Sequence, residues 1–356
     1  MPAPRVAVIG TGGTISSVGK HGLDLVAYLE NNKIYEVDEL LNAFPETLDQ
    51  GDIIPVRLRA MPSTAIGPVE WLEINSKIHQ LVEEDPSLDG IVVTHGTATL
   101  EETAYFLNLT AKVEIPIVLV GAQRPASGMG TDSGINLVNA IRTAGHPDSR
   151  GRGVLGVLND EIHFSRDMTK TSTLRQQTFK SHDFGLLGHA DWDKVAYYRM
   201  PERRRAPHTE FDVRGMKDLP RVDISVTYAG THGTAIDAFA AAGAKGIVVG
   251  TMAPGYVPPV EFEKLQAAAE KGIIIVHMAG YPCNVQRILK ICKKKNLKLI
   301  EDCAHGLGTY VKKKHVGNYG KSGSFSFYPT KQITTGEGGM VITNDFSFYK
   351  KIKTLK

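Results

Sequence analysis

The stretch Arg5-Val6-Ala7-Val8-Ile9-Gly10-Thr11-Gly12-Gly13-Thr14-Ile15 joins an apolar run to a glycine-rich turn. The four apolar residues from Val6 to Ile9 predict a short strand that is buried on both faces. Glycines in the turn permit positive φ and let backbone N–H groups approach a ligand closely. Because open α/β sheets bind ligands beyond the carboxyl ends of their strands, the hydroxyls of Thr11 and Thr14 lie where chemistry is expected.

Three interpretations of this turn stay open at this point. A threonine hydroxyl held on a stiff turn can act as a nucleophile once a base takes its proton. The same glycines also suit a dinucleotide-binding loop or a plain strand-to-loop turn. The G-x-G-x-x-G fingerprint needs a third glycine where the chain has Ile15, which weakens the dinucleotide alternative.

The composition is that of an ordinary globular protein, with 356 residues, 42% of them hydrophobic and 22% charged. This length predicts two or three domains. No apolar run approaches the roughly 18 residues of a membrane helix, and no basic or apolar leader precedes the strand at Val6. We therefore expect a cytoplasmic protein without a membrane partner.

The formal net charge of +3 conceals two unlike parts. Residues 277–356 hold 14 Lys and 1 Arg against 4 acids, whereas residues 1–276 are acidic overall and richer in Arg than in Lys. The three cysteines, at 283, 292 and 303, all lie in the basic part, and their spacing fits no zinc motif, so we expect reduced thiols. Lysine runs at 293–295 and 312–314 favour a solvated face over nucleic-acid binding. This break in usage indicates that two sequences of different origin are joined.

Strands and helices alternate from residue 1 to about 195, which predicts an α/β domain with a doubly wound parallel sheet. We expect a polar linker over residues 196–221, a smaller α/β domain over 222–276 and a separate fragment over 277–356. Thr99 followed by Glu102 predicts a capping box for a helix over 101–109. Thr97 lies too early to cap that helix.

Four strand ends carry hydroxyl or amine side chains that could meet in one cleft, namely Thr14, Ser63, Thr97 and Lys170. A buried lysine can act as a base when loss of solvation lowers its pKa, and a neighbouring hydroxyl can relay the proton. The alternative for Lys170 is the commoner one, an ordinary surface lysine beside a strand.

Residues 1 to about 276 resemble the bacterial-type L-asparaginase family. The matching motifs are TGGTI at 11–15, HGT at 95–97, TLEET at 99–103, GAQRP at 121–125 and DMTKT at 167–171, together with residues 222–228 and 233–238. The resemblance implies a cofactor-independent amidohydrolase that converts asparagine or a related small amide to the acid and ammonia. The family's tendency to form tetramers leaves a homo-oligomer open.

The resemblance also implies a role for each matching residue. Thr14 is the attacking hydroxyl, Thr97 and Lys170 form a second hydroxyl–lysine pair, and Tyr28 is the candidate tyrosine of the flap. Substrate-binding positions are Gly13, Ser63, which receives the substrate carboxylate, and Ala98.

Ala98 departs from the family pattern. The family usually has Asp directly after the second threonine, where its carboxylate receives the substrate's α-ammonium. Without it, the ammonium loses a charge-assisted hydrogen bond of about 1.5–3 kcal/mol, and Lys170 loses an anion that would raise its pKa. Amide hydrolysis is therefore better supported than asparagine as the substrate.

The chain from about residue 277 resembles the DegT/DnrJ/StrS-type sugar aminotransferases, which use pyridoxal phosphate. The matching motifs are LIEDCAH at 299–305, SFSFYPTK at 324–331 and GEGG at 336–339. By this resemblance Lys331 is the Schiff-base lysine, Asp302 faces the pyridine nitrogen and His305 lies near the ring. The half of the family that cradles the cofactor phosphate has no counterpart here.

We therefore interpret the chain as a chimera of the two families. An asparaginase-type amidohydrolase is the first interpretation of its function. A pyridoxal-phosphate aminotransferase and an inactive folded protein are the alternatives.

Overall fold

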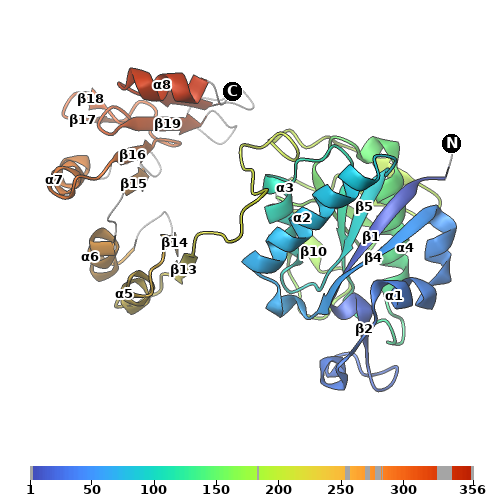
Figure 1. Cartoon of the computed structure of the whole chain (residues 1–356). Coiled ribbons are helices and arrows are strands. Elements are labelled where there is room, and N and C mark those ends of the chain that lie inside the picture. Colours follow the sequence, from blue (N-terminus) through green and yellow to red (C-terminus); the bar gives the residue numbers. More distant parts are fainter. Residues whose placement is uncertain are drawn as a thin grey trace. The chain divides into compact units, whose positions relative to one another are not determined.

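The computed structural model describes residues 3–182, 184–252, 257–268, 273–276, 282, 284–326 and 339–353. The chain divides into two units, Met1–Leu219 and Pro220–Lys356, which can be followed by colour in Figure 1.

An eight-stranded sheet forms the centre of the first unit, in the order β12-β11-β8-β7-β6-β5-β1-β4. Five of its strands run parallel: β1 (Arg5–Gly12), β4 (Asp52–Met61), β5 (Gly90–Thr94), β6 (Ile117–Val120) and β7 (Val154–Leu158). The remaining strands, β8 (Glu161–Phe164), β11 (Gly188–Ala190) and β12 (Val195–Tyr197), pair antiparallel.

The prediction of a wholly parallel sheet is therefore wrong for these last three strands. Asn159 and Asp160 join β7 to β8 with φ of 53° and 63°. Positive φ at both central residues closes a tight two-residue hairpin, which forces the next strand to run antiparallel. The doubly wound, parallel part of the prediction holds for the strands that precede this turn.

Helices cover both faces of the sheet. α1 (Val37–Ala43) and α4 (Ser133–Gly145) pack with Val6 and Val8 of β1. α2 (Pro68–Glu84) and α3 (Leu100–Thr110) pack with Ala7 and Ile9 on the opposite face. All four of these β1 residues are completely buried, and each fully buried Val or Ile side chain contributes about 1.5–3 kcal/mol. The apolar run at the start of the chain is thus the shared centre of two cores.

Short elements fill the connections of the first unit. They are η1 (Thr14–Ser16), β2 (Ser17–Val18), η2 (Tyr28–Asn31), β3 (Lys33–Ile34), η3 (Pro45–Gln50), η4 (Ser63–Ala65), η5 (Pro147–Ser149), β9 (Thr169–Lys170) and β10 (Phe179–Lys180). β2 pairs antiparallel with β3, and β9 pairs antiparallel with β10. η1 and η4 directly follow the parallel strands β1 and β4, so they lie at the carboxyl ends of these strands.

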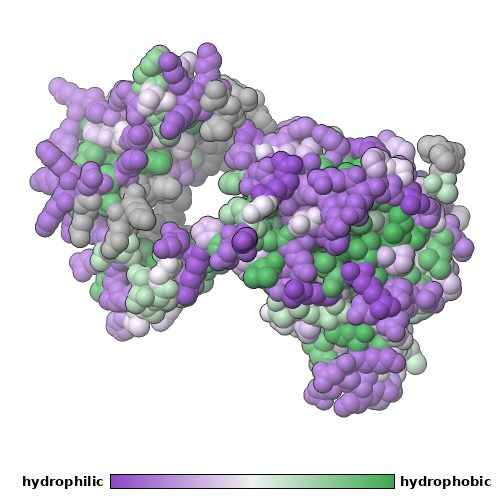
Figure 2. All heavy atoms as spheres, in the orientation of Figure 1, coloured by the Kyte–Doolittle hydropathy of each residue, from purple (hydrophilic) through white to green (hydrophobic). Residues whose placement is uncertain are grey.

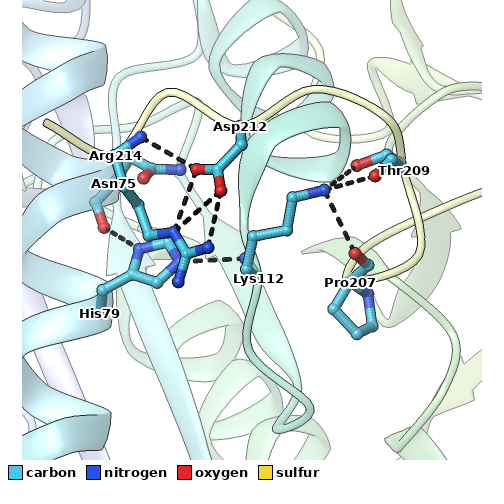
Figure 3. Close-up of polar contacts among 7 residues, drawn as sticks. All are labelled: Asn75, His79, Lys112, Pro207, Thr209, Asp212 and Arg214. Atoms are coloured by element: carbon cyan, nitrogen blue, oxygen red, sulfur yellow. Dashed lines mark hydrogen bonds and ion pairs between the residues drawn. The ribbon is translucent and has the colours of Figure 1, made fainter. Parts of the chain in front are cut away.

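Part of the segment expected to be a linker lies within the first unit, where it contacts Lys112 (Figure 3). Lys112 Nζ donates to Pro207 O at 3.3 Å, to Thr209 O at 2.6 Å and to Thr209 Oγ1 at 2.8 Å. The backbone N–H of Lys112 donates to Nε2 of the buried His79, whose Nδ1 lies 2.7 Å from Asn75 O. The segment around Pro207 and Thr209 is therefore attached to the loop that follows α3.

The described residues of the second unit form three sheets, the smallest being the hairpin of β17 (Tyr310–Val311) and β18 (Lys314–His315). β13 (Val222–Val226) pairs parallel with β14 (Gly246–Gly250), and α5 (Thr234–Ala241) and α6 (Pro259–Ala268) follow these two strands. A four-stranded sheet has the order β15-β16-β19-β20, from Ile273–Val276, Leu299–Asp302, Ser322–Ser326 and Gly339–Ile342. β15 thus pairs with β16, on the far side of the expected junction near residue 277.

Exposed lysines surround this second sheet. α7 (Val285–Lys295) buries Val285, Ile288 and Cys292 while Lys293 and Lys294 are exposed. The lysines at 312–314, in the β17–β18 hairpin, are also exposed. Hydrophilic residues dominate the visible face around α7 and α8 (Phe346–Lys353) in Figure 2. This exposure agrees with the solvated face that the sequence predicts. Within the described ranges, no helix is long and apolar enough to cross a membrane.

Candidate active site

The loops after β1, β4 and β5 meet through their main chains. A Cβ on Gly13, whose φ is +85°, would lie 2.2 Å from Gly96 N, and one on Gly12 would lie 2.5 Å from Met61 N. The N–H of Gly13 also donates to Met61 O at 3.0 Å. Glycine is required at both positions because any side chain would overlap backbone atoms of the neighbouring loop.

The first hydroxyl pair consists of Thr14 and Tyr28. Thr14 begins η1 directly after the two glycines, and Tyr28 begins η2. Thr14 Oγ1 lies 2.8 Å from Tyr28 Oη, and either hydroxyl can donate. Both side chains are half-buried, so the pair is shielded from bulk water while remaining within reach of a small ligand.

The second pair consists of Thr97 and Lys170. Lys170 Nζ donates to Thr97 Oγ1 at 2.7 Å, across 73 residues of sequence. Thr97 is buried in the loop after β5, and Lys170 is half-buried on β9. Burial lowers the pKa of Lys170, and the negative charge of Glu101 raises it. Lys170 is therefore not the ordinary surface lysine of the alternative interpretation.

Ser63 lies against the same loops. A Cβ on Gly96 would lie 2.5 Å from Ser63 Oγ, and Thr99 Oγ1 donates to Ser63 O at 2.8 Å. The predicted capping box is therefore wrong. Thr99 is the N-cap residue of α3, but its side chain makes no cap hydrogen bond because its hydroxyl bonds the β4 loop instead. Ala98, the residue before it, is exposed.

His95 supports the loop that carries Gly96 and Thr97. No role is assigned to it from the sequence. It is completely buried, with Nδ1 2.8 Å from Gly96 O and Nε2 2.9 Å from Thr103 Oγ1. The carbonyl oxygen of Gly96 can only accept, so the ring carries its proton on Nδ1 and the Thr103 hydroxyl donates to Nε2. Trp71 Nε1 donates to that same threonine oxygen at 2.9 Å. Burial lowers the pKa of His95 to about 4. A neutral imidazole therefore fixes the carbonyl of Gly96.

The GAQRP motif borders the Thr97 loop. A Cβ on Gly121 would lie 2.8 Å from His95 O and 2.9 Å from Thr97 Cγ2. The carboxylate of the buried Asp132, which precedes α4, accepts the backbone N–H groups of Gln123 at 3.0 Å and Arg124 at 3.0 Å. A buried carboxylate thus holds the turn of this motif against the end of β5.

The residues expected to hold pyridoxal phosphate do not form a site within the described ranges. Asp302 ends β16, and its Oδ1 accepts the backbone N–H of Ala304 at 2.9 Å. His305 follows on the same connection, whereas Lys331 lies outside the described residues. The described part supplies one carboxylate and one imidazole from neighbouring positions, without the lysine.

Comparison with known proteins agrees with both resemblances. Residues 5–203 match the family described as Asparaginase, N-terminal, and residues 221–356 match the DegT/DnrJ/EryC1/StrS aminotransferase family. The chain is 37% identical over 279 residues to the probable periplasmic L-asparaginase of Haemophilus influenzae, covering 78% of each. It is 37% identical over 281 residues to L-asparaginase 2 of Escherichia coli, again covering 78% of each.

A solved structure agrees with these sequence matches. The probable cytoplasmic L-asparaginase from Campylobacter jejuni superposes with a TM-score of 0.71 at 32% identity, over 83% of this chain and 82% of that one. The fold and the matches define the class of this enzyme as an asparaginase-type amidohydrolase. The chain belongs to the asparaginase family, and its residues 221–356 match the aminotransferase family.

Proposed function

We propose that this enzyme hydrolyses asparagine or a related small amide with Thr14 as its nucleophile. The observation that carries the proposal is the pairing of Thr14 with Tyr28 and of Thr97 with Lys170 at 2.8 and 2.7 Å. The two pairs stand on loops that touch at Gly13 and Gly96. One pair can therefore serve the attack on the amide and the other the attack by water.

In the first step Thr14 Oγ1 attacks the amide carbonyl. Its proton passes through the Tyr28 hydroxyl to the amide nitrogen, the C–N bond breaks, and ammonia leaves. The acyl group remains as an ester on Thr14, which is the covalent intermediate that divides hydrolysis into two easier steps.

In the second step water attacks the ester carbonyl. Thr97 passes the proton of that water to the neutral form of Lys170, whose burial favours loss of its charge. The proton then returns to Thr14 Oγ1 as the ester bond breaks, so the acid product leaves and the hydroxyl is restored. Ser63, buried between the β4 and β5 loops, is the proposed ligand for the substrate carboxylate.

The direct test is ammonia release from asparagine by the full chain and by Thr14→Ala. We expect the variant to lose turnover by at least about 10⁴-fold while its thermal unfolding changes little. Thr173→Ala is the matched control, because Thr173 is exposed, and it should keep wild-type turnover. Undiminished turnover in Thr14→Ala would overturn the assignment of the nucleophile.

Location and assembly stay predictions. The relatives include a probable periplasmic enzyme and a probable cytoplasmic one. We propose a cytoplasmic location, as for the probable cytoplasmic enzyme of Campylobacter jejuni, and a homo-oligomer from the tetramers that the resemblance implies. Fractionation of the source cells tests the location, and light scattering of the purified chain tests the oligomer.

A further inference from the structure

The backbone of Lys170 is attached to a side chain outside its own hairpin. Thr171 N donates to Thr178 O at 2.8 Å across the β9–β10 hairpin. Successive N–H groups of a strand point to opposite sides. The N–H group of Lys170 therefore points away from β10. It donates to Oε2 of Glu101, 69 residues earlier in the chain.

Glu101 belongs to the segment that also carries Thr97. It lies in the first turn of α3, which begins at Leu100 directly after the Thr97 loop. The two segments are therefore joined twice, once by the main chain of Lys170 on Glu101 and once by Lys170 Nζ on Thr97 Oγ1. The contact with Glu101 holds the backbone of Lys170, and the contact with Thr97 holds the amine at the end of its side chain.

We propose that Glu101 is a positioning residue for amide hydrolysis, holding the Lys170 backbone so that Lys170 Nζ reaches Thr97. This inference rests on the proposed function, because it assigns a purpose to the Thr97–Lys170 pair. A displacement of about 1 Å in a catalytic group can cost on the order of 100-fold in rate. A two-residue strand such as β9 needs such an external attachment to prevent that displacement.

The charge of Glu101 has a second consequence for Lys170. Its carboxylate raises the pKa of the lysine against the lowering caused by burial. Other charges of the neighbouring segments are engaged elsewhere: Arg166 with Tyr105, Asp167 with Arg199, and Lys180 with Glu161. Glu101 is thus the anion that sets the balance between the ammonium and the free amine of Lys170.

A purely structural role for Glu101 would be support of the α3 N-terminus. Acidic side chains in a first turn stabilise a helix through its dipole, and both Glu101 and Glu102 lie in this turn. Glu102 is exposed, whereas Glu101 is half-buried and contacts Lys170. Glu102 therefore offers a control with the same side chain, helix and turn.

The test compares Gln and Ala at position 101 with the same changes at position 102 in the full chain. The first readout is the pH dependence of Lys170 acylation by acetic anhydride, measured by mass spectrometry of its peptide. Glu101→Gln should shift the midpoint to lower pH by about one unit. The ammonium form of Lys170 then loses the anion that stabilises it, so the free amine forms at lower pH. Glu102→Gln should leave the midpoint unchanged, and equal midpoints in the two variants would overturn the inference.

The second readout is turnover. Glu101→Ala should lower kcat by about 10- to 100-fold with little change in KM, while Glu101→Gln keeps an acceptor oxygen and should recover most of kcat. Equal kcat in Glu101→Ala and Glu102→Ala would contradict positioning. If the wild-type chain released no ammonia from any amide, the proposed function would fail, and the acylation midpoints would still decide whether Glu101 acts on Lys170.

Discussion

Gly13 and Gly96 touch so closely that a Cβ on Gly13 would lie 2.2 Å from the backbone nitrogen of Gly96. The loops that present Thr14 and Thr97 are therefore held together by main chain rather than by interchangeable side chains. Backbone packing of this kind fixes the separation of the two threonines, because neither loop can move closer to the other. The two glycines at the contact also have no side chain that could rotate and change the spacing.

Gly13→Ala should disrupt this contact and abolish turnover. The new methyl group overlaps Gly96, and the φ of +85° adds strain of about 1–3 kcal/mol. Gly215→Ala is the matched control, because its φ is +79° and nothing lies within 4 Å of its Cβ position. Urea unfolding should show a modest loss of stability in the control. Ammonia release should show that the control keeps full activity. Similar behaviour of the two variants would show that the contact is unimportant.

Thr97→Val should remove the relay hydroxyl and keep the shape of the side chain. Lys170 Nζ then loses the oxygen that it contacts at 2.7 Å, so kcat should fall by about 10²–10⁴-fold, the usual size of a general acid–base contribution. Thr97→Ser keeps the hydroxyl and should retain most activity. If valine and serine gave equal kcat in a steady-state assay, Thr97 would have no part in proton transfer.

Ala98→Asp should restore recognition of an α-ammonium group. Ala98 is exposed, so the new carboxylate stays solvated until substrate arrives. A charge-assisted hydrogen bond of about 1.5–3 kcal/mol corresponds to a decrease in KM for asparagine of about 10- to 100-fold. Succinamic acid, which is asparagine without its α-amine, provides the comparison. Equal changes in KM for both amides would mean that position 98 does not face the ammonium.

His95 should make the folded state sensitive to mild acid. Its folded pKa of about 4 lies below the unfolded value of 6.5, so only the unfolded chain gains this proton between these two pH values. The free energy of unfolding should therefore be highest above pH 6.5 and fall by on the order of 3 kcal/mol as the pH decreases to 4.

Chemical denaturation across that pH range measures this effect. His95→Asn should be less stable at neutral pH but should lose less stability on acidification than the wild-type chain. His208→Asn, at an exposed position, should keep the wild-type slope. A slope in His95→Asn as steep as that of the wild type would assign the acid sensitivity to other groups.

The C-terminal part should not retain pyridoxal phosphate. Asp302 Oδ1 already accepts the backbone N–H of Ala304, and the sequence predicts no counterpart of the family's phosphate-binding half. Incubation with the cofactor followed by desalting should leave no absorbance band of an internal aldimine and no transaminase activity. A retained band that disappears in Lys331→Ala would show that the fragment builds a working site.

The sequence predicts the parts of the fold that depend on local patterns. Strand β1 and the buried strand over 89–93 follow from apolar runs, and the motif positions follow from the strand ends. The antiparallel strands were missed because the Asn159-Asp160 turn was not recognised as a hairpin. The capping box failed because the Thr99 hydroxyl bonds Ser63, 36 residues away, a partner that no local pattern reveals. No local pattern reveals the role of Glu101 for the same reason, because its partner Lys170 is 69 residues away.

The pairing of β15 with β16 bears on how two unrelated genes can fuse into one folded chain. The sequence predicts a junction near residue 277, which makes β15 the last strand of the asparaginase-like part, although the aminotransferase family match begins at residue 221. β15 is hydrogen-bonded to β16 beyond that predicted junction, from Ile273↔Leu299 to Val276↔Asp302. A parallel ladder is built from peptide groups, which are the same in every sequence. Recombination next to an apolar strand can therefore give that strand a new hydrogen-bonded neighbour. A breakpoint at such a strand is one that natural selection and protein engineers can both tolerate.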